Sequence, residues 1–152
     1  EIFNKNKKKN QINIENKDII PDGLTALYDG IKFMCSDITE ACGNEANSDT
    51  TVIILTDGAE NSSQHASLGF IRKLLSEKQG LGWKFIFLGA NQDAIIAGKN
   101  LGINQKSCCT YSATPGGLSS ALRCTSDAIE RSQNSTEEIQ FTQEERNETI
   151  NS

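Results

Sequence analysis

The sequence contains no apolar run long enough to cross a membrane. A spanning helix needs about 18–20 consecutive apolar residues, whereas the longest apolar runs, residues 51–55 and 85–90, have the length of single strands. The start of the chain also lacks the charged and apolar pattern of a secretory signal. Both absences predict a cytoplasmic protein without a membrane span.

Cysteine pairs at the spacing of a zinc site are missing as well. The five cysteines include no CxxC pattern, and two of them, Cys108 and Cys109, are adjacent. Zinc sites usually take pairs of cysteines that are separated by a short spacer. We therefore interpret the cysteines as reduced thiols of a cytosolic protein.

Basic residues do not outnumber acidic ones. The chain of 152 residues carries 15 lysines and arginines against 20 acidic residues, which is a formal net charge of −5. Nucleic-acid-binding domains usually carry a basic surface, and phosphate-binding patterns such as the P-loop or GxGxxG are also absent. The composition excludes a general nucleic-acid binder and leaves a chain long enough for one domain with a buried core.

The hydrophobic pattern predicts strands that alternate with helices. Three short apolar runs have the composition of buried strands, and four longer segments repeat apolar residues at helical spacing. The strands are residues 51–55, 83–88 and 108–111; the helices begin near residues 25, 64, 93 and 117 and end near residues 42, 78, 101 and 131. This alternation predicts an α/β fold with a doubly wound, mostly parallel, Rossmann-like sheet and helices on both faces.

Two predictions concern the C-terminal third of the chain. Leu118, Leu122 and Ile129 recur on one side of the last predicted helix, at the spacing of a helical apolar face. Residues 132–152 are polar and charged with few apolar residues. We expect them to form a disordered tail outside the domain of residues 1–131.

Polar side chains follow the first predicted strand. Residues 56–63 read TDGAENSS, and ligands of α/β sheets bind where the strands end. Carboxylate and hydroxyl oxygens are suitable ligands for Mg²⁺ or Ca²⁺. Asp57 in this segment and Thr25 at the start of the first helix are therefore candidate metal ligands. The alternative is that both residues cap helices.

Three segments together resemble the von Willebrand factor type A domain family. In chain order they are residues 21–31, PDGLTALYDGI, residues 52–63, VIILTDGAENSS, and residues 82–94, GWKFIFLGANQDA. The resemblance spans about residues 1–131 and implies a Rossmann-like sheet with a metal-ion-dependent adhesion site at its rim.

The resemblance also implies a set of ligands. Thr25 and Asp57 would ligate Mg²⁺ or another divalent cation, with Asn61 or Ser62 as further rim contacts. An acidic group of a protein partner would complete the six oxygens that Mg²⁺ prefers. The implied function is a protein-binding module.

One family motif is absent from the chain. Family members carry an Asp-x-Ser-x-Ser motif that supplies the other metal ligands, and no such motif precedes Thr25. The resemblance therefore implies a partial domain in residues 1–131, without roughly 40 residues that would form two strands and one helix. It implies further that residues 52–55 form an exposed apolar edge. Mg²⁺ binding by this chain alone is expected to be weak or absent.

The same residues leave two other functions open. Asp57 and Glu60 could form the site of a Mg²⁺-dependent phosphohydrolase, with His65 as a general base. A decayed fragment that binds neither metal nor partner is the third interpretation. We favour a protein-binding module without enzymatic activity, and the identity of its protein partner stays open.

Overall fold

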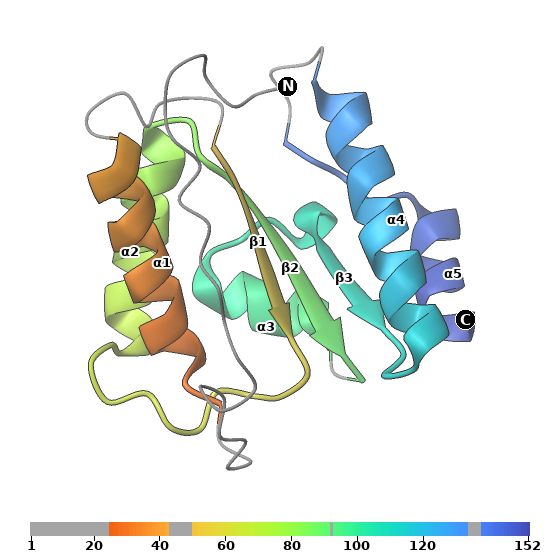
Figure 1. Cartoon of the computed structure of the whole chain (residues 1–152), viewed down its shortest axis with the longest axis horizontal. Helices are drawn as coiled ribbons and strands as arrows, with labels where there is room; N and C mark the ends of the chain where they lie inside the picture. Colours follow the sequence, from red (N-terminus) through yellow and green to blue (C-terminus); the bar gives the residue numbers. More distant parts are fainter. Residues whose placement is uncertain (1–24, 43–49, 92, 134–137) are drawn as a thin grey trace.

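The computed structural model describes residues 25–42, 50–91, 93–133 and 138–152, and Figure 1 shows their arrangement. Three strands form an open parallel sheet in the order β1-β2-β3. The mixed α/β fold predicted from the sequence is confirmed for these residues, and none of their helices is long and apolar enough to span a bilayer. The elements, in chain order, are α1 (Leu27–Cys42), β1 (Thr51–Thr56), α2 (Leu68–Gly80), β2 (Lys84–Ala90), α3 (Ala94–Leu101), a 3-10 turn (Gln105–Ser107), β3 (Cys108–Tyr111), α4 (Pro115–Ser132) and α5 (Gln143–Asn151).

The central strand, β2, separates two hydrophobic cores. Phe85 and Phe87 point to one face of the sheet, whereas Ile86 and Leu88 point to the other, as the two-residue period of a strand requires. Helices α1, α2 and α3 contribute to the first core, and α4 and the segment before α5 contribute to the second. All four side chains are at most 4% exposed. Burial on both faces explains why this strand reads as a continuous apolar run.

Helix α3 begins and ends where its local chemistry predicts. The carboxylate of Asp93 accepts hydrogen bonds of 3.1 Å from the backbone N–H groups of Ile95 and Ile96, which lack partners within the helix. The helix ends at Gly102, whose φ of 88° is left-handed and suits glycine. These caps hold α3 in place between the ends of β2 and β3.

The buried face of α4 differs from the predicted one. Leu118 and Leu122 are 36% and 49% exposed, and only Ile129 of the predicted side packs partly against the second core. Small side chains form the buried face instead. At the first turn of the helix there is no room for a side chain, since a Cβ atom added at Gly117 would lie 2.1 Å from the carbonyl oxygen of Ser112. The buried residues of α4 are Gly117, Ala121, Cys124, Thr125, Ala128 and Ser132.

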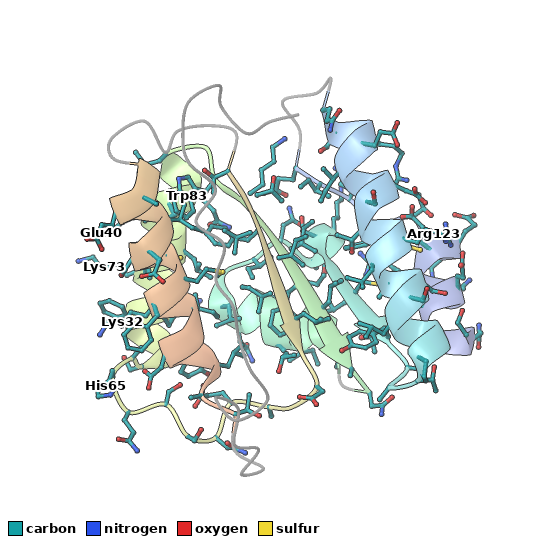
Figure 2. The ribbon with its side chains drawn as sticks, in the orientation of Figure 1. Lys32, Glu40, His65, Lys73, Trp83 and Arg123 are labelled. Atoms are coloured by element: carbon teal, nitrogen blue, oxygen red, sulfur yellow. The ribbon has the colours of Figure 1, made fainter. Side chains whose placement is uncertain are left out.

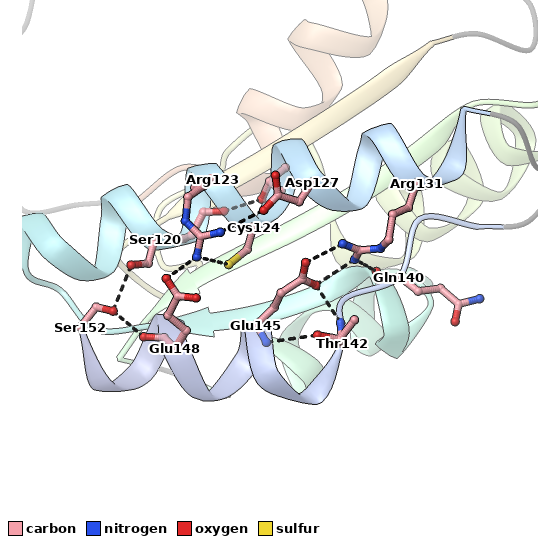
Figure 3. Close-up of polar contacts among 12 residues, drawn as sticks. Ser120, Arg123, Cys124, Asp127, Arg131, Gln140, Thr142, Glu145, Glu148 and Ser152 are labelled. Carbon is pink, nitrogen blue, oxygen red and sulfur yellow. Dashed lines mark hydrogen bonds and ion pairs between the residues drawn. The ribbon is translucent and has the colours of Figure 1, made fainter.

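The prediction of a disordered tail in residues 132–152 is wrong for the described part of that segment. Helix α5 lies along α4, and Figure 3 shows the ion pairs that join Arg131 to Glu145 and Arg123 to Glu148. The segment has few apolar residues, but those before α5 complete the second core. Its fully or largely buried side chains are Ile139, Phe141 and Thr149.

The two edges of the sheet differ. At the β3 edge, Thr149 donates a 2.8 Å hydrogen bond to a strand carbonyl oxygen, and the Arg146 guanidinium donates to carbonyl oxygens within residues 105–108. At the other edge, no strand among the described residues pairs with the outer side of β1. Ile53 and Leu55 of this strand are 42% and 46% exposed. In the described part of the chain, the exposed apolar edge that was expected for residues 52–55 is therefore present on one face only, at Ile53 and Leu55, whereas Val52 and Ile54 are buried in the first core.

Candidate functional site

The two predicted metal ligands line one groove at the carboxyl end of β1. Thr25 lies before the start of α1, and Asp57 directly follows the last residue of β1. The groove has a volume of about 480 Å³. Its other lining residues are Ala26, Leu27, Leu55, Thr56, Tyr111 and Leu118. The tertiary structure thus brings together two oxygen-bearing side chains that are far apart in the sequence.

Thr25 lies against the turn that follows Asp57. A Cβ atom added at Gly58 would lie 2.7 Å from the Oγ1 atom of Thr25, which is closer than van der Waals contact allows. The backbone N–H of Thr25 donates a 2.7 Å hydrogen bond to Oδ1 of Asn61, and its carbonyl oxygen accepts one of 3.1 Å from the Asn61 N–H. The Thr25 hydroxyl is therefore held beside the segment that carries Asp57. Asn61, predicted as a rim contact, uses its side-chain oxygen to fix Thr25.

Asp57 is exposed at the rim of the groove, near Tyr111 of β3. Burial raises the pKa of the Tyr111 hydroxyl, and the negative charge of Asp57 raises it further. Within the described ranges, no side chain forms a hydrogen bond or ion pair with the Asp57 carboxylate. Its oxygens are available to a ligand from outside this part of the chain.

Glu60 is a structural residue. Its Oε2 atom accepts hydrogen bonds from the N–H of Tyr28 (2.8 Å) and the hydroxyl of Ser63 (2.7 Å). Its Oε1 atom accepts from the N–H groups of Ser62 (2.9 Å) and Ser63 (2.7 Å). Desolvation alone would raise the pKa of Glu60, but these hydrogen bonds lower the pKa below its ordinary value. Ser62, the other predicted rim contact, takes part in this loop through its backbone.

Asp29 forms the reciprocal contact from α1. Its carboxylate accepts hydrogen bonds from the backbone N–H groups of Gln64 (2.8 Å) and His65 (2.9 Å). Desolvation opposes ionisation, but these hydrogen bonds and the nearby His65 lower the pKa of Asp29 below its ordinary value. Asp29 and Glu60 together join the loop after β1 to the start of α1. No local spacing reveals this pairing, because the partners lie on different elements.

His65 lies on the outer side of this loop. Figure 2 shows it on the same side of the molecule as Lys32, whose Nζ donates a 3.2 Å hydrogen bond to the His65 carbonyl oxygen. The imidazole meets the Phe33 ring edge-on, with 6.5 Å between the ring centroids. Because His65 does not line the groove, its geometry gives no support to a role as a general base for Asp57.

The described cysteines are poor nucleophiles. Cys35, Cys108, Cys109 and Cys124 are free and buried. Burial raises the pKa of each thiol, that of Cys108 to about 12. A thiol with a raised pKa carries little thiolate at neutral pH, so these side chains pack as apolar groups.

The groove offers the oxygen ligands that a hard cation prefers, but fewer of them than such a cation needs. The Thr25 hydroxyl and the Asp57 carboxylate are oxygen donors, whereas Mg²⁺ takes about six oxygens in octahedral geometry. In the described part of the chain, no three His, Cys, Asp or Glu side chains are grouped so that they could hold a metal ion.

Comparison of the chain with protein-family models, with curated proteins and with solved structures gives no match. The likeness to the von Willebrand factor type A family therefore rests on the three sequence segments alone. Residues 21–24 of the first segment lie outside the described residues.

Proposed function

We propose that the chain is a protein-binding module of the von Willebrand factor type A kind. In this proposal Thr25 and Asp57 hold a divalent cation, which binds an acidic group of a partner protein. The observation that carries the proposal is the position of both side chains in one groove at the end of a strand. Hydrogen bonds to Asn61 fix the backbone of Thr25, so one ligand is held in place before a cation arrives.

The lining of the groove suits a protein partner. Leu55 and Leu118 lie beside the polar rim, and both are more than one third exposed. Interfaces between proteins commonly combine an apolar patch with a polar rim. A cation with few protein ligands also keeps coordination positions that an acidic side chain can take.

The phosphohydrolase alternative has less support. It requires Glu60 as a second carboxylate at the metal, but four hydrogen bonds engage both oxygens of Glu60 within the loop. It also requires a base near the metal, and His65 does not line the groove. Asp57 would then be the one carboxylate that lines the groove among the described residues.

Isothermal titration of the full chain with Mn²⁺ and Mg²⁺ tests the proposal. We expect weak binding, with a dissociation constant of about 1 mM, because the protein supplies only two of roughly six ligands. Acetate, added as a substitute for the partner's acidic group, should tighten the binding. Asp57→Ala should abolish it. Asp37→Ala, which removes an exposed carboxylate from α1, should leave it unchanged.

Two results would contradict the proposal. If the wild-type chain binds no cation with or without acetate, the decayed-fragment interpretation holds. Mg²⁺-dependent hydrolysis of p-nitrophenyl phosphate that disappears in Asp57→Ala would instead favour the phosphohydrolase.

A further inference from the structure

Tyr111 brings a phenol to the groove from the far side of the sheet. It is the last residue of β3, and β2 separates that strand from β1 (Figure 1). Tyr111 nevertheless lines the same groove as Thr25 and Asp57. Burial raises the pKa of its hydroxyl, and the negative charge of Asp57 raises that pKa further. The hydroxyl is thus within the electrostatic reach of the predicted metal ligand.

A small residue of β2 leaves room for this side chain. Ala90 is the partner of Tyr111 in the register of β2 and β3. Both side chains belong to the second core, on the face of the sheet that α4 covers. Side chains that face the same way on neighbouring strands stand next to each other. A large side chain at position 90 would therefore stand between Tyr111 and β1, whereas alanine allows the ring to reach the groove.

The Tyr111 hydroxyl is a hydrogen-bond donor in a buried position. The residue is 6% exposed, and the hydroxyl forms no hydrogen bond with the part of the chain that the structure describes. Buried polar groups of proteins are nearly always hydrogen-bonded. A phenol keeps its proton at neutral pH, since its ordinary pKa is about 10, and it can donate that proton to an acceptor. The groove therefore holds a donor for a ligand that enters it.

We propose that the Tyr111 hydroxyl donates a hydrogen bond to the carboxylate of the partner protein. This inference rests on the proposed function, in which the same carboxylate binds the cation held by Thr25 and Asp57. A carboxylate has two oxygens; when one of them binds the cation, the other loses water in the groove and needs a donor. Tyr111 supplies it, and such charge-assisted hydrogen bonds are stronger than neutral ones. The groove is then selective for a carboxylate over an anion of one atom, such as chloride.

A direct bond from Tyr111 to the cation has less support. The phenol would have to lose its proton to become a strong ligand. Burial and the charge of Asp57 both raise the pKa of Tyr111, which opposes that loss. The neutral hydroxyl is suited to donate a hydrogen bond to an anion instead.

Calorimetry of the full chain with Mn²⁺ and acetate tests the role of Tyr111. Mn²⁺ is titrated in sodium acetate and in sodium chloride of the same ionic strength, and the ratio of the two affinities gives the gain from acetate. Tyr111→Phe removes only the hydroxyl. We expect the affinity for Mn²⁺ in chloride to stay within about twofold of the wild-type value, and the gain from acetate to be lost or to fall about tenfold.

Tyr28→Phe is the matched control. Tyr28 is the other tyrosine of the chain and does not line the groove, so its loss should leave the gain from acetate unchanged. Near-ultraviolet difference spectra give a second measurement, because a phenol that donates to a carboxylate absorbs at longer wavelength. Acetate added with Mn²⁺ should shift the tyrosine absorption of the wild type and of Tyr28→Phe, but not that of Tyr111→Phe. Circular dichroism checks that each variant is folded.

The outcomes separate this inference from the proposed function. Tyr111 has no such role if Tyr111→Phe keeps the full gain from acetate, if both tyrosine variants lose it equally, or if acetate does not tighten cation binding by the wild type. A loss of Mn²⁺ affinity in chloride in Tyr111→Phe would assign the hydroxyl to the cation instead. Each of these results leaves the cation site of Thr25 and Asp57 in place. A wild-type chain that binds no cation in either salt would overturn the proposed function and this inference together.

Discussion

The carboxylate of Glu60 accepts a 2.8 Å hydrogen bond from the backbone N–H of Tyr28, in the first turn of α1. The first N–H groups of a helix have no partner within the helix and need an acceptor from elsewhere. Here the acceptor comes from the loop after β1, and Asp29 of α1 bonds back to the same loop. These two carboxylates fix the loop that carries Asp57 relative to the helix that Thr25 precedes.

The stability of the chain should fall as the pH is lowered through the range of about 5 to 3. Folding lowers the pKa of Asp29 and of Glu60, so the unfolded chain binds protons at a higher pH than the folded chain does. The stabilisation is complete above the ordinary carboxyl pKa of about 4 and is lost as both groups become protonated in the folded state. Urea unfolding at several pH values measures the effect.

Glu60→Gln provides the matched test of this pH dependence. The substitution should reduce the free energy of unfolding at pH 7 by about 1 kcal/mol. Both carboxylate oxygens of Glu60 accept charge-assisted hydrogen bonds, whereas glutamine offers one neutral oxygen as an acceptor and an NH₂ group that cannot accept. The substitution should also flatten the pH dependence. Asp37→Asn, at an exposed position of α1, should keep the wild-type slope. An unchanged slope in Glu60→Gln would show that the loop does not depend on this carboxylate.

Gly58→Ala should destabilise the chain through Thr25. The added Cβ atom would lie 2.7 Å from Thr25 Oγ1, so Thr25 must move, and we expect a cost of about 1 kcal/mol. The cost should shrink when Thr25→Ala removes the hydroxyl, which a double-mutant cycle measures. Gly30→Ala is the control, since a Cβ atom there meets no atom within 4 Å; it should stabilise α1 by about 0.5–1 kcal/mol. If the losses of unfolding free energy in Gly58→Ala and Thr25→Ala are additive in the double variant, the close approach of Gly58 to the Thr25 hydroxyl is refuted.

Ala121→Leu should destabilise the chain more than Leu122→Ala does. Ala121 is fully buried between α4 and the sheet, whereas Leu122 is 49% exposed. Overpacking at Ala121 should cost about 1–3 kcal/mol, and removal of the exposed leucine should cost about 0.5 kcal/mol or less. Thermal or urea unfolding compares the two variants. The reverse order would mean that the leucine face of α4 is the buried one.

Thr149→Val tests whether the C-terminal segment is part of the fold. The Thr149 hydroxyl donates a 2.8 Å hydrogen bond to the carbonyl oxygen of Thr110, and the side chain is fully buried. Valine has nearly the same shape but no donor, so we expect a loss of about 1–2 kcal/mol in unfolding free energy. Ile150→Val, at the exposed neighbouring position, should be nearly neutral. No loss in Thr149→Val would indicate that α5 contributes little to stability.

Local patterns predicted most of the secondary structure. The continuous apolar runs became β1 and β2, and residues 108–111 form β3 as expected. Helix α3 begins near residue 93 as expected, with Asp93 as its cap. The site could be predicted only in part: Thr25 and Asp57 share a groove, but the structural use of Glu60 depends on contacts between distant segments.

The sequence by itself determined β1, β2 and β3, the helices α1 to α4 and their order, because hydrophobic period and capping act between residues a few positions apart. Only the tertiary structure decided which face of α4 is buried: the face with Ala121, Cys124 and Ala128 packs in the second core, whereas Leu118 and Leu122 stay 36% and 49% exposed. The tertiary structure also decided the place of residues 138–152. Their few apolar side chains, Ile139 and Phe141, are enough to hold the segment against the domain because they pack in the second core. Burial and hydrogen bonding depend on partners that meet only when distant parts of the chain pack together.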